Sequence, residues 1–134
     1  MTNLWVDANI LLRFLTGEPP DLAQRALGLI QKAESGEVTL RLSPIVVAEV
    51  IWVLSSFYKY SRVQIAEVLL PLVAAEGILL DDLEQVIAAI ERMANANVDF
   101  IDAYLAEIAR QKGETIVSFD RDFKRLEIDW VQPE

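Results

Sequence analysis

The sequence predicts an α/β fold with three α/β/α layers around a central, mostly parallel sheet of four to five short strands. Short apolar runs typical of strands alternate with longer amphipathic stretches typical of helices, and turn residues separate them. Such alternation is typical of a parallel sheet that helices cover on both faces. The chain has 134 residues, 53% of them hydrophobic, so we expect one domain over residues 1–134 with a sizeable core.

The first half of the chain is expected to begin with a short buried strand that ends at Asp7. Pro20 suits the first turn of a helix, and Ser43 with Pro44 forms an N-cap followed by proline. The helix that Ser43 opens is apolar almost all round, so we expect it to be buried. In order, the expected elements are a strand at 4–6, helices at 10–15 and 20–36, a strand at 38–42 and a helix at 45–57.

The second half repeats the alternation. Ser61 and Gln64 have the spacing of a capping box, and Asp81 and Asp82 stand where they can cap the next helix. Gly113 is expected to end the last long helix. In order, the expected elements are a helix at 61–77, a strand at 78–80, a helix at 83–93, a loop at 95–98, a helix at 100–113 and strands at 115–118 and 128–131.

The composition excludes several classes of protein. The absence of Cys and His removes disulfides, Cys-based zinc sites and the side chains that most often act as bases at neutral pH. No apolar run reaches the roughly 18 residues of a membrane span, and no signal peptide is evident, so we expect a cytoplasmic location. The net charge of −9 argues against an electrostatic clamp on nucleic acid, but not against an enzyme that meets phosphates through bound metal.

Three acidic residues stand at strand or helix ends where an α/β fold can bring carboxylates together. Asp7 and Asp120 each follow a predicted strand, and Asp102 lies in the first turn of a predicted helix. If the two strands are neighbours where the strand order reverses, the carboxylates of Asp7 and Asp120 converge. The structural alternatives are a helix cap for Asp7, a favourable contact with the helix dipole for Asp102 and a turn for Asp120.

Glu49 is the fourth acidic candidate, and it lies in the helix that is expected to be buried. A buried carboxylate without a partner is unstable, and the neighbours one turn away, Ile45 and Val53, cannot pair with it. A distant Arg is one possible partner, and a metal ion is the other. Because hard oxygen ligands select hard cations, we expect Mg²⁺ or Mn²⁺.

Four segments of the chain resemble the PIN-domain ribonucleases, especially the VapC-type toxins of toxin–antitoxin pairs. The segment Ser118-Phe119-Asp120-Arg121-Asp122-Phe123 is the most specific of them. The matching segments, which follow the order of the family, are 6–12, 43–50, 99–106 and 117–123.

The resemblance implies a site and an activity. The catalytic and metal-binding residues would be Asp7, Glu49, Asp102 and Asp120, with Asn9 and Ser118 in support and Asp99 and Asp122 as spare acids nearby. The activity would be hydrolysis of RNA phosphodiester bonds with one or two Mg²⁺ or Mn²⁺ ions. The absence of His agrees with this, because it excludes a mechanism based on a pair of histidines. Relatives of the VapC type bind an antitoxin and usually form homodimers. We therefore expect this protein to bind a cognate antitoxin and a second copy of itself.

Cations and aromatic residues add two further expectations. Arg13 and Arg121 are our candidates for contacts with substrate phosphates, with a solvated surface charge as the alternative. An aromatic group around the junction of two central helices is expected to lie in the core, or else to line a groove for an apolar segment of the antitoxin. Its members are Trp52, Phe57, Tyr58 and Tyr60.

Other functions remain open from the sequence. A PIN-type nuclease in RNA processing or DNA-structure cleavage would carry the same local residues, and growth arrest on expression would distinguish the toxin from it. A non-catalytic α/β binding module would use the acids only as caps and turns, and it would gain no stability from metal. A phosphohydrolase that forms an aspartyl phosphate would need a second Asp two residues after Asp7, where this chain has Asn9.

Overall fold

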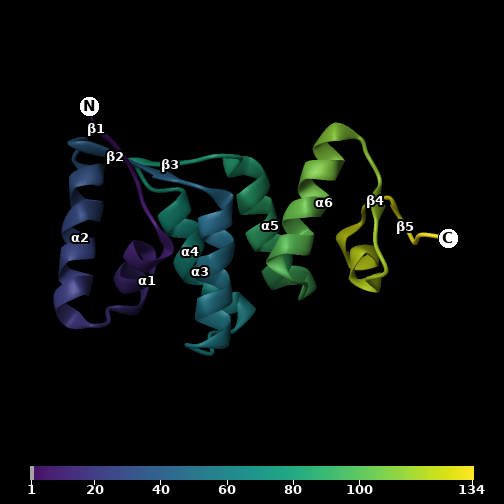
Figure 1. Ribbon diagram of the computed structural model, residues 1–134, viewed down its shortest axis with the longest axis horizontal. Coiled ribbons are helices and arrows are strands. Elements are labelled where there is room, and N and C mark those ends of the chain that lie inside the picture. The colour runs from purple at the N-terminus through teal and green to yellow at the C-terminus, as the bar shows by residue number, and fades with distance from the viewer. Residues whose placement is uncertain (1) are drawn as a thin grey trace. The chain divides into compact units, whose positions relative to one another are not determined.

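Strands and helices alternate along the chain in the computed structural model, which describes residues 2–134 (Figure 1). The chain divides into two units, the first ending at Leu83 and the second beginning at Glu84. Within the described residues, no helix is long and apolar enough to cross a membrane. The elements are β1 (Thr2–Trp5), α1 (Ala8–Thr16), α2 (Pro20–Glu34), β2 (Val38–Leu42), α3 (Pro44–Ser56), α4 (Arg62–Val73), β3 (Ile78–Leu80), α5 (Leu83–Ala96), α6 (Phe100–Lys112), β4 (Ile116–Val117), the 3₁₀ helix η1 (Arg121–Leu126) and β5 (Trp130–Val131).

The sheet of the first unit has three parallel strands in the order β1-β2-β3. Leu40 in the central strand pairs with Leu4 on one side and with Ile78 on the other. Leu40 and Leu42 are fully buried, whereas all four residues of β1 are exposed. A pair of helices connects each strand to the next, as parallel strands require.

The α/β class and the parallel pairing are confirmed, but the arrangement of the sheet differs from the prediction. We expected one sheet of four to five strands. The five described strands form a three-stranded sheet in the first unit and a two-stranded parallel sheet, β4 with β5, in the second. These last two strands have only two residues each, so their apolar pattern is too short to reveal their pairing.

Caps predicted from the sequence form at three helices of the first unit. The side chain of Asp7 accepts a hydrogen bond from the backbone N–H of Ile10, and Ser43 accepts one from Ile45, both at 3.2 Å. Ser61 and Gln64 make the complete capping box. These side chains satisfy donors that a helix N-terminus otherwise leaves open, so they fix where α1, α3 and α4 begin.

The prediction that α3 is buried all round is wrong. Its buried face consists of Val47, Val50, Ile51 and Leu54. The opposite face exposes Trp52, with 68% of its surface accessible, and Phe57 just beyond the helix, with 74%. The expectation that these two aromatic residues lie in the core is therefore also wrong. Tyr58 and Tyr60 are half-buried, and each packs edge-on against a neighbouring ring of the same cluster.

The second unit is held together around Arg110, near the end of α6. Its guanidinium donates to the carbonyl oxygens of Leu126 and Glu127, where η1 ends, and pairs with Glu107 one turn back on α6. Arg92 on α5 lies 3.9 Å from the carboxylates of both Glu107 and Glu127. This ion-pair network ties η1 to α6. The sequence pattern did not predict η1, because its residues form no long apolar repeat.

Candidate functional site

Asp7 lies between β1 and α1, at the carboxyl end of the first strand as predicted. Only its Oδ1 atom is used in the cap, and the side chain is exposed. Asn9 is exposed in the first turn of α1, and no hydrogen bond joins it to Asp7 in the described structure. Asp7 is therefore a helix cap whose second carboxylate oxygen is available to another group.

Glu49 lies on the exposed face of α3, near Trp52 in the helix, and not in the core. The expectation that Glu49 is buried is wrong, because the apolar residues around it include several that face solvent. No ion pair to Glu49 occurs among residues 2–134. Glu49 therefore needs no cation to offset burial. Its membership in the metal site now depends on the family resemblance and stays a prediction.

The second unit brings acidic side chains from two elements together. Asp99 is the N-cap residue of α6 but makes no capping hydrogen bond, and Asp102 is half-buried in the first turn of the same helix. Asp120 and Asp122 belong to the start of η1. The Asp120 side chain lies within hydrogen-bonding reach of the Asp102 carboxyl. Asp99 and Asp122 add negative charge close to the Asp102 carboxyl.

Ser118 and the backbone position Asp120. The Ser118 Oγ atom accepts a hydrogen bond from the backbone N–H of Asp120 at 3.0 Å, and the Asp120 Oδ1 atom accepts one from the N–H of Asp122 at 2.9 Å. The Ser118 carbonyl is in turn held by the indole N–H of Trp130 at 2.9 Å. The Ser118 side chain therefore holds the backbone of Asp120, and its supporting role in a functional site stays a prediction.

The environment of Asp102 disfavours its charged form. Burial raises the pKa of Asp102, the negative charges of Asp99, Asp120 and Asp122 raise it further, and so does the hydrogen bond that the protonated Asp102 carboxyl can donate to Asp120. No cation contributes to this shift. A bound cation near Asp102 would offset this concentration of negative charge.

The four predicted site acids are divided between the units. Asp7 and Glu49 belong to the first unit, and Asp102 and Asp120 belong to the second. Within either unit, the described acids form no group of three or more arranged to hold a metal ion. The donor chemistry still suits Mg²⁺ or Mn²⁺, because every candidate ligand is a carboxylate oxygen and the Asp102–Asp120 pair has an excess of negative charge.

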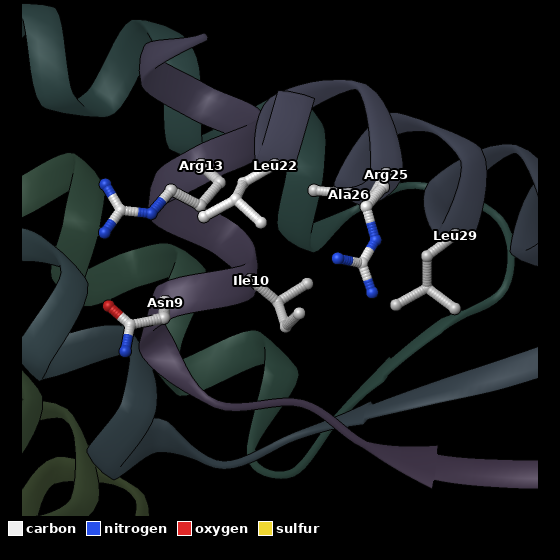
Figure 2. A pocket seen from close by; sticks show the side chains of 7 residues that line it. All are labelled: Asn9, Ile10, Arg13, Leu22, Arg25, Ala26 and Leu29. Carbon is white, nitrogen blue, oxygen red and sulfur yellow. The ribbon is translucent and has the colours of Figure 1, made fainter. Parts of the chain in front are cut away.

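The two predicted phosphate contacts have different surroundings. Arg121 is exposed at the start of η1 beside Asp120, and it makes no ion pair in the part of the chain that the structure describes. Arg13 of α1 lines a recess of about 420 Å³ between α1 and α2 (Figure 2). Arg25, Asn9 and apolar side chains of both helices line the same recess.

The comparisons with known proteins place the chain in a family. The family model for the PIN domain matches residues 4–129 and so runs through both units. The chain belongs to the PIN domain family. One solved structure with a detectable likeness is the crystal structure of VapBC2 from Rickettsia felis bound to a DNA fragment from their promoter. It is 18% identical, with 100% of each chain covered and a TM-score of 0.41. No curated protein sequence matches.

Sequence reasoning missed two arginines of this PIN domain. Arg25 lies on the same face of α2 as Leu22 and Leu29, and only the packing of α1 against α2 forms the recess that it lines, so no local pattern marked it. Arg110 stands three residues after Glu107, a spacing that indicates an ion pair but not a bond to η1. Both residues depend on tertiary contacts that the sequence pattern does not encode.

Proposed function

We propose that this PIN domain is an endoribonuclease that hydrolyses RNA phosphodiester bonds with Mg²⁺ or Mn²⁺. Members of the family are generally nucleases. The observation that carries the proposal is the pairing of Asp102 with Asp120 beside two further carboxylates. When no cation is bound, the repulsion among these carboxylates destabilises the folded protein. When a divalent ion is bound, the same carboxylates can act as its ligands.

The proposed metal ligands are Asp7, Glu49, Asp102 and Asp120. Asp102 and Asp120 are neighbours in the second unit, and Asp7 and Glu49 are included because the segments that contain them resemble those of the family. Asp99 and Asp122 are the spare acids, and either could take the place of a neighbour. A bound divalent ion would supply Lewis-acid activation of water and neutralise charge on the phosphate.

The other residues of the proposed site would hold ligands and substrate in position. Asp7 and Asp120 each use Oδ1 for a backbone hydrogen bond, which fixes the direction of the other oxygen. Ser118 would keep the Asp120 backbone in place. Arg121, exposed next to Asp120, would contact a substrate phosphate as a bidentate donor. No histidine is present to act as a base, which favours hydrolysis with metal.

We further propose that the protein is the toxin of a toxin–antitoxin pair, active in the cytoplasm as a single domain over residues 1–134 and as a homodimer. The resemblance of four sequence segments to VapC-type toxins supports this assignment. The exposed Trp52 and Phe57 support an apolar contact with a protein partner, either the antitoxin or the second subunit. The alternative is a PIN nuclease of RNA processing or DNA-structure cleavage.

Calorimetry with Mn²⁺ tests the metal site without knowledge of the RNA. The wild type should bind Mn²⁺ saturably, and Glu49→Gln and Asp102→Asn should each weaken binding by about tenfold or more. Asp21→Asn is the matched control, because Asp21 also lies in the first turn of a helix but belongs to α2. Equal, weak binding in all four proteins would mean that the acids only attract ions diffusely, and the proposal would fail.

Cleavage and growth assays then distinguish a toxin from a nuclease of RNA processing. Single-stranded RNA should be cut in Mn²⁺ and left intact in EDTA, and Asp102→Asn should abolish cutting. Expression of the wild type should arrest growth, and Asp102→Asn should not. Cleavage without growth arrest would favour a processing nuclease over a toxin.

A further inference from the structure

The recess between α1 and α2 is lined by both apolar and positively charged side chains. Its volume is about 420 Å³. The side chains of Asn9, Ile10 and Arg13 line it from α1, and those of Leu22, Arg25 and Leu29 line it from α2. Figure 2 shows the apolar side chains of Ile10 and Leu22 between the guanidinium groups of Arg13 and Arg25. The recess therefore has an apolar centre with a cation on either side.

The two cations are not neutralised by the protein. No ion pair or hydrogen bond engages Arg25 among the residues that the structure describes, and Arg13 donates only to the carbonyl oxygen of Glu18, at 3.3 Å. The lining includes no acidic side chain, although the chain has 21 acidic and 12 basic residues. In a protein with this excess of negative charge, two unpaired guanidiniums in one recess indicate an anionic ligand.

The recess begins in the helical turn that Asp7 caps. Asn9 and Ile10 are lining residues, and the N–H of Ile10 donates to the Asp7 carboxylate. A ligand in the recess would therefore lie next to one of the proposed metal ligands. A recess of this volume falls in the range of about 300–1,000 Å³ that is common for small-ligand sites, so it has room for one nucleotide.

We propose that this recess binds one nucleotide of the RNA substrate, next to the bond that is cut. Arg13 and Arg25 would bind the flanking phosphates, for which the planar guanidinium is suited. Ile10, Leu22 and Leu29 would contact the face of an unstacked base, as aromatic and apolar side chains do in pockets that hold a base outside its stack. This inference rests on the proposed nuclease function and adds Arg25 and the apolar contacts to it.

RNA binding in EDTA tests the recess apart from the metal. The probe is a fluorescein-labelled, mixed-sequence, single-stranded RNA of ten nucleotides. Arg25→Gln should weaken binding by about five- to tenfold. For this variant, the slope of the logarithm of RNA affinity against the logarithm of salt concentration should be smaller in magnitude by about 0.7. That is the change expected for one lost phosphate contact to a single strand. Lys32→Gln removes the same charge from α2 outside the recess, and it should bind within about twofold of the wild type.

A second variant tests the contact with the base. Leu29→Ala should lower the affinity for the RNA about threefold while leaving the salt slope unchanged, because no phosphate contact is lost. Circular dichroism of each variant verifies the fold. Equal changes in slope for Leu29→Ala and Arg25→Gln would contradict the division into base and phosphate contacts and overturn the proposal.

The possible outcomes distinguish failure of the recess proposal from failure of the nuclease proposal. If the wild type cuts RNA but Arg25→Gln binds it as well as Lys32→Gln does, the recess proposal is wrong and the nuclease stands. If Arg25→Gln weakens binding but no protein cuts RNA in Mn²⁺, the recess binds RNA without a bond being cut beside it, and the nuclease proposal is wrong. If Arg25→Gln binds RNA normally but releases a co-expressed partner protein, the recess is a protein-docking site and the proposal is wrong.

Discussion

The side chains of Asp102 and Asp120 lie within hydrogen-bonding reach of each other, although one residue lies in α6 and the other begins η1. The protein keeps this pair in place with several separate contacts. Arg110 ties the end of η1 to α6, and Ser118 holds the backbone of Asp120. Two carboxyls repel each other once both are ionised, so the pair lowers stability at neutral pH unless a cation is present.

Asp102→Asn should stabilise the metal-free protein at neutral pH. The pKa of Asp102 is raised in the folded state, so the folded protein holds its proton more tightly than the unfolded chain does. The stability supplied by this group is therefore present at low pH and is lost as pH rises through the folded pKa. In EDTA at pH 7.5 the Tm of Asp102→Asn should exceed that of the wild type by about 3 °C.

The same difference in Tm should vanish near pH 3, where Asp102 is protonated in both states. Asp21→Asn is the control, because it removes an exposed acid from the first turn of α2 and should lower the Tm slightly at pH 7.5. Thermal unfolding followed by circular dichroism measures both. A Tm of Asp102→Asn below that of the wild type at pH 7.5 would contradict the raised pKa.

Mn²⁺ should reverse the order of stability between the wild type and Asp102→Asn. A ligand that binds only the folded state adds roughly 2.7 kcal/mol when its concentration is about a hundred times Kd. The wild type and Asp21→Asn should gain this stabilisation, and Asp102→Asn should gain little. Urea unfolding with and without Mn²⁺ measures the effect. Equal stabilisation of all three proteins would show that Asp102 is not a ligand.

Ser118→Ala should affect the metal site more than the fold. It removes the acceptor for the N–H of Asp120, a loss of about 1 kcal/mol in the free energy of unfolding. Because Asp120 would then be held less rigidly, Mn²⁺ affinity should fall by about tenfold. Ser118→Thr keeps the hydroxyl and should stay within about twofold of the wild type. If Thr and Ala behave alike in calorimetry, the hydroxyl does not position Asp120.

The parts of the fold that the sequence predicted are those marked by local signals. The strands at 38–42 and 78–80 have the expected bounds because apolar runs there end at polar or turn residues. The capping box at Ser61 and Gln64 places α4, and Gly113 ends α6 in the left-handed conformation that glycine readily adopts. Each of these signals lies within a few residues of the boundary that it predicts.

The parts that the sequence did not predict depend on tertiary contacts. The sequence does not say which apolar residues of α3 face the core and which face solvent. The exposure of Trp52, and of Glu49 on the same side of the helix, could therefore not be predicted. The helix η1 needs Arg110 from another element, and the recess needs α1 packed against α2. In the candidate site, sequence positions suggested the four acids, which stay a prediction, but they did not indicate that Asp120 lies beside Asp102.

Arg110→Gln should loosen η1 while leaving α6 folded. It removes the charged donor to two carbonyls and the ion pair with Glu107, and we expect a loss of about 1–2 kcal/mol. Hydrogen exchange should speed up in residues 116–131 but not in the first unit. Lys112→Gln removes an exposed charge at the same helix end and serves as the control. Unchanged exchange in residues 116–131 would contradict the role of Arg110.

Gly77→Ala should destabilise the first unit strongly because the backbone passes close to α2 before β3. Gly77 has φ +81°, and a Cβ atom there would lie 2.3 Å from the carbonyl oxygen of Ala33. A contact this short forces the backbone to move, which should add about 2 kcal/mol or more to the roughly 1 kcal/mol cost of a left-handed alanine. Gly36→Ala is the matched control, with φ +84° and no atom within 4 Å of the added Cβ. Urea unfolding should therefore show a loss in Gly36→Ala near 1 kcal/mol and a loss in Gly77→Ala about three times as large. Equal losses would mean that the close approach of Gly77 to Ala33 does not constrain the fold.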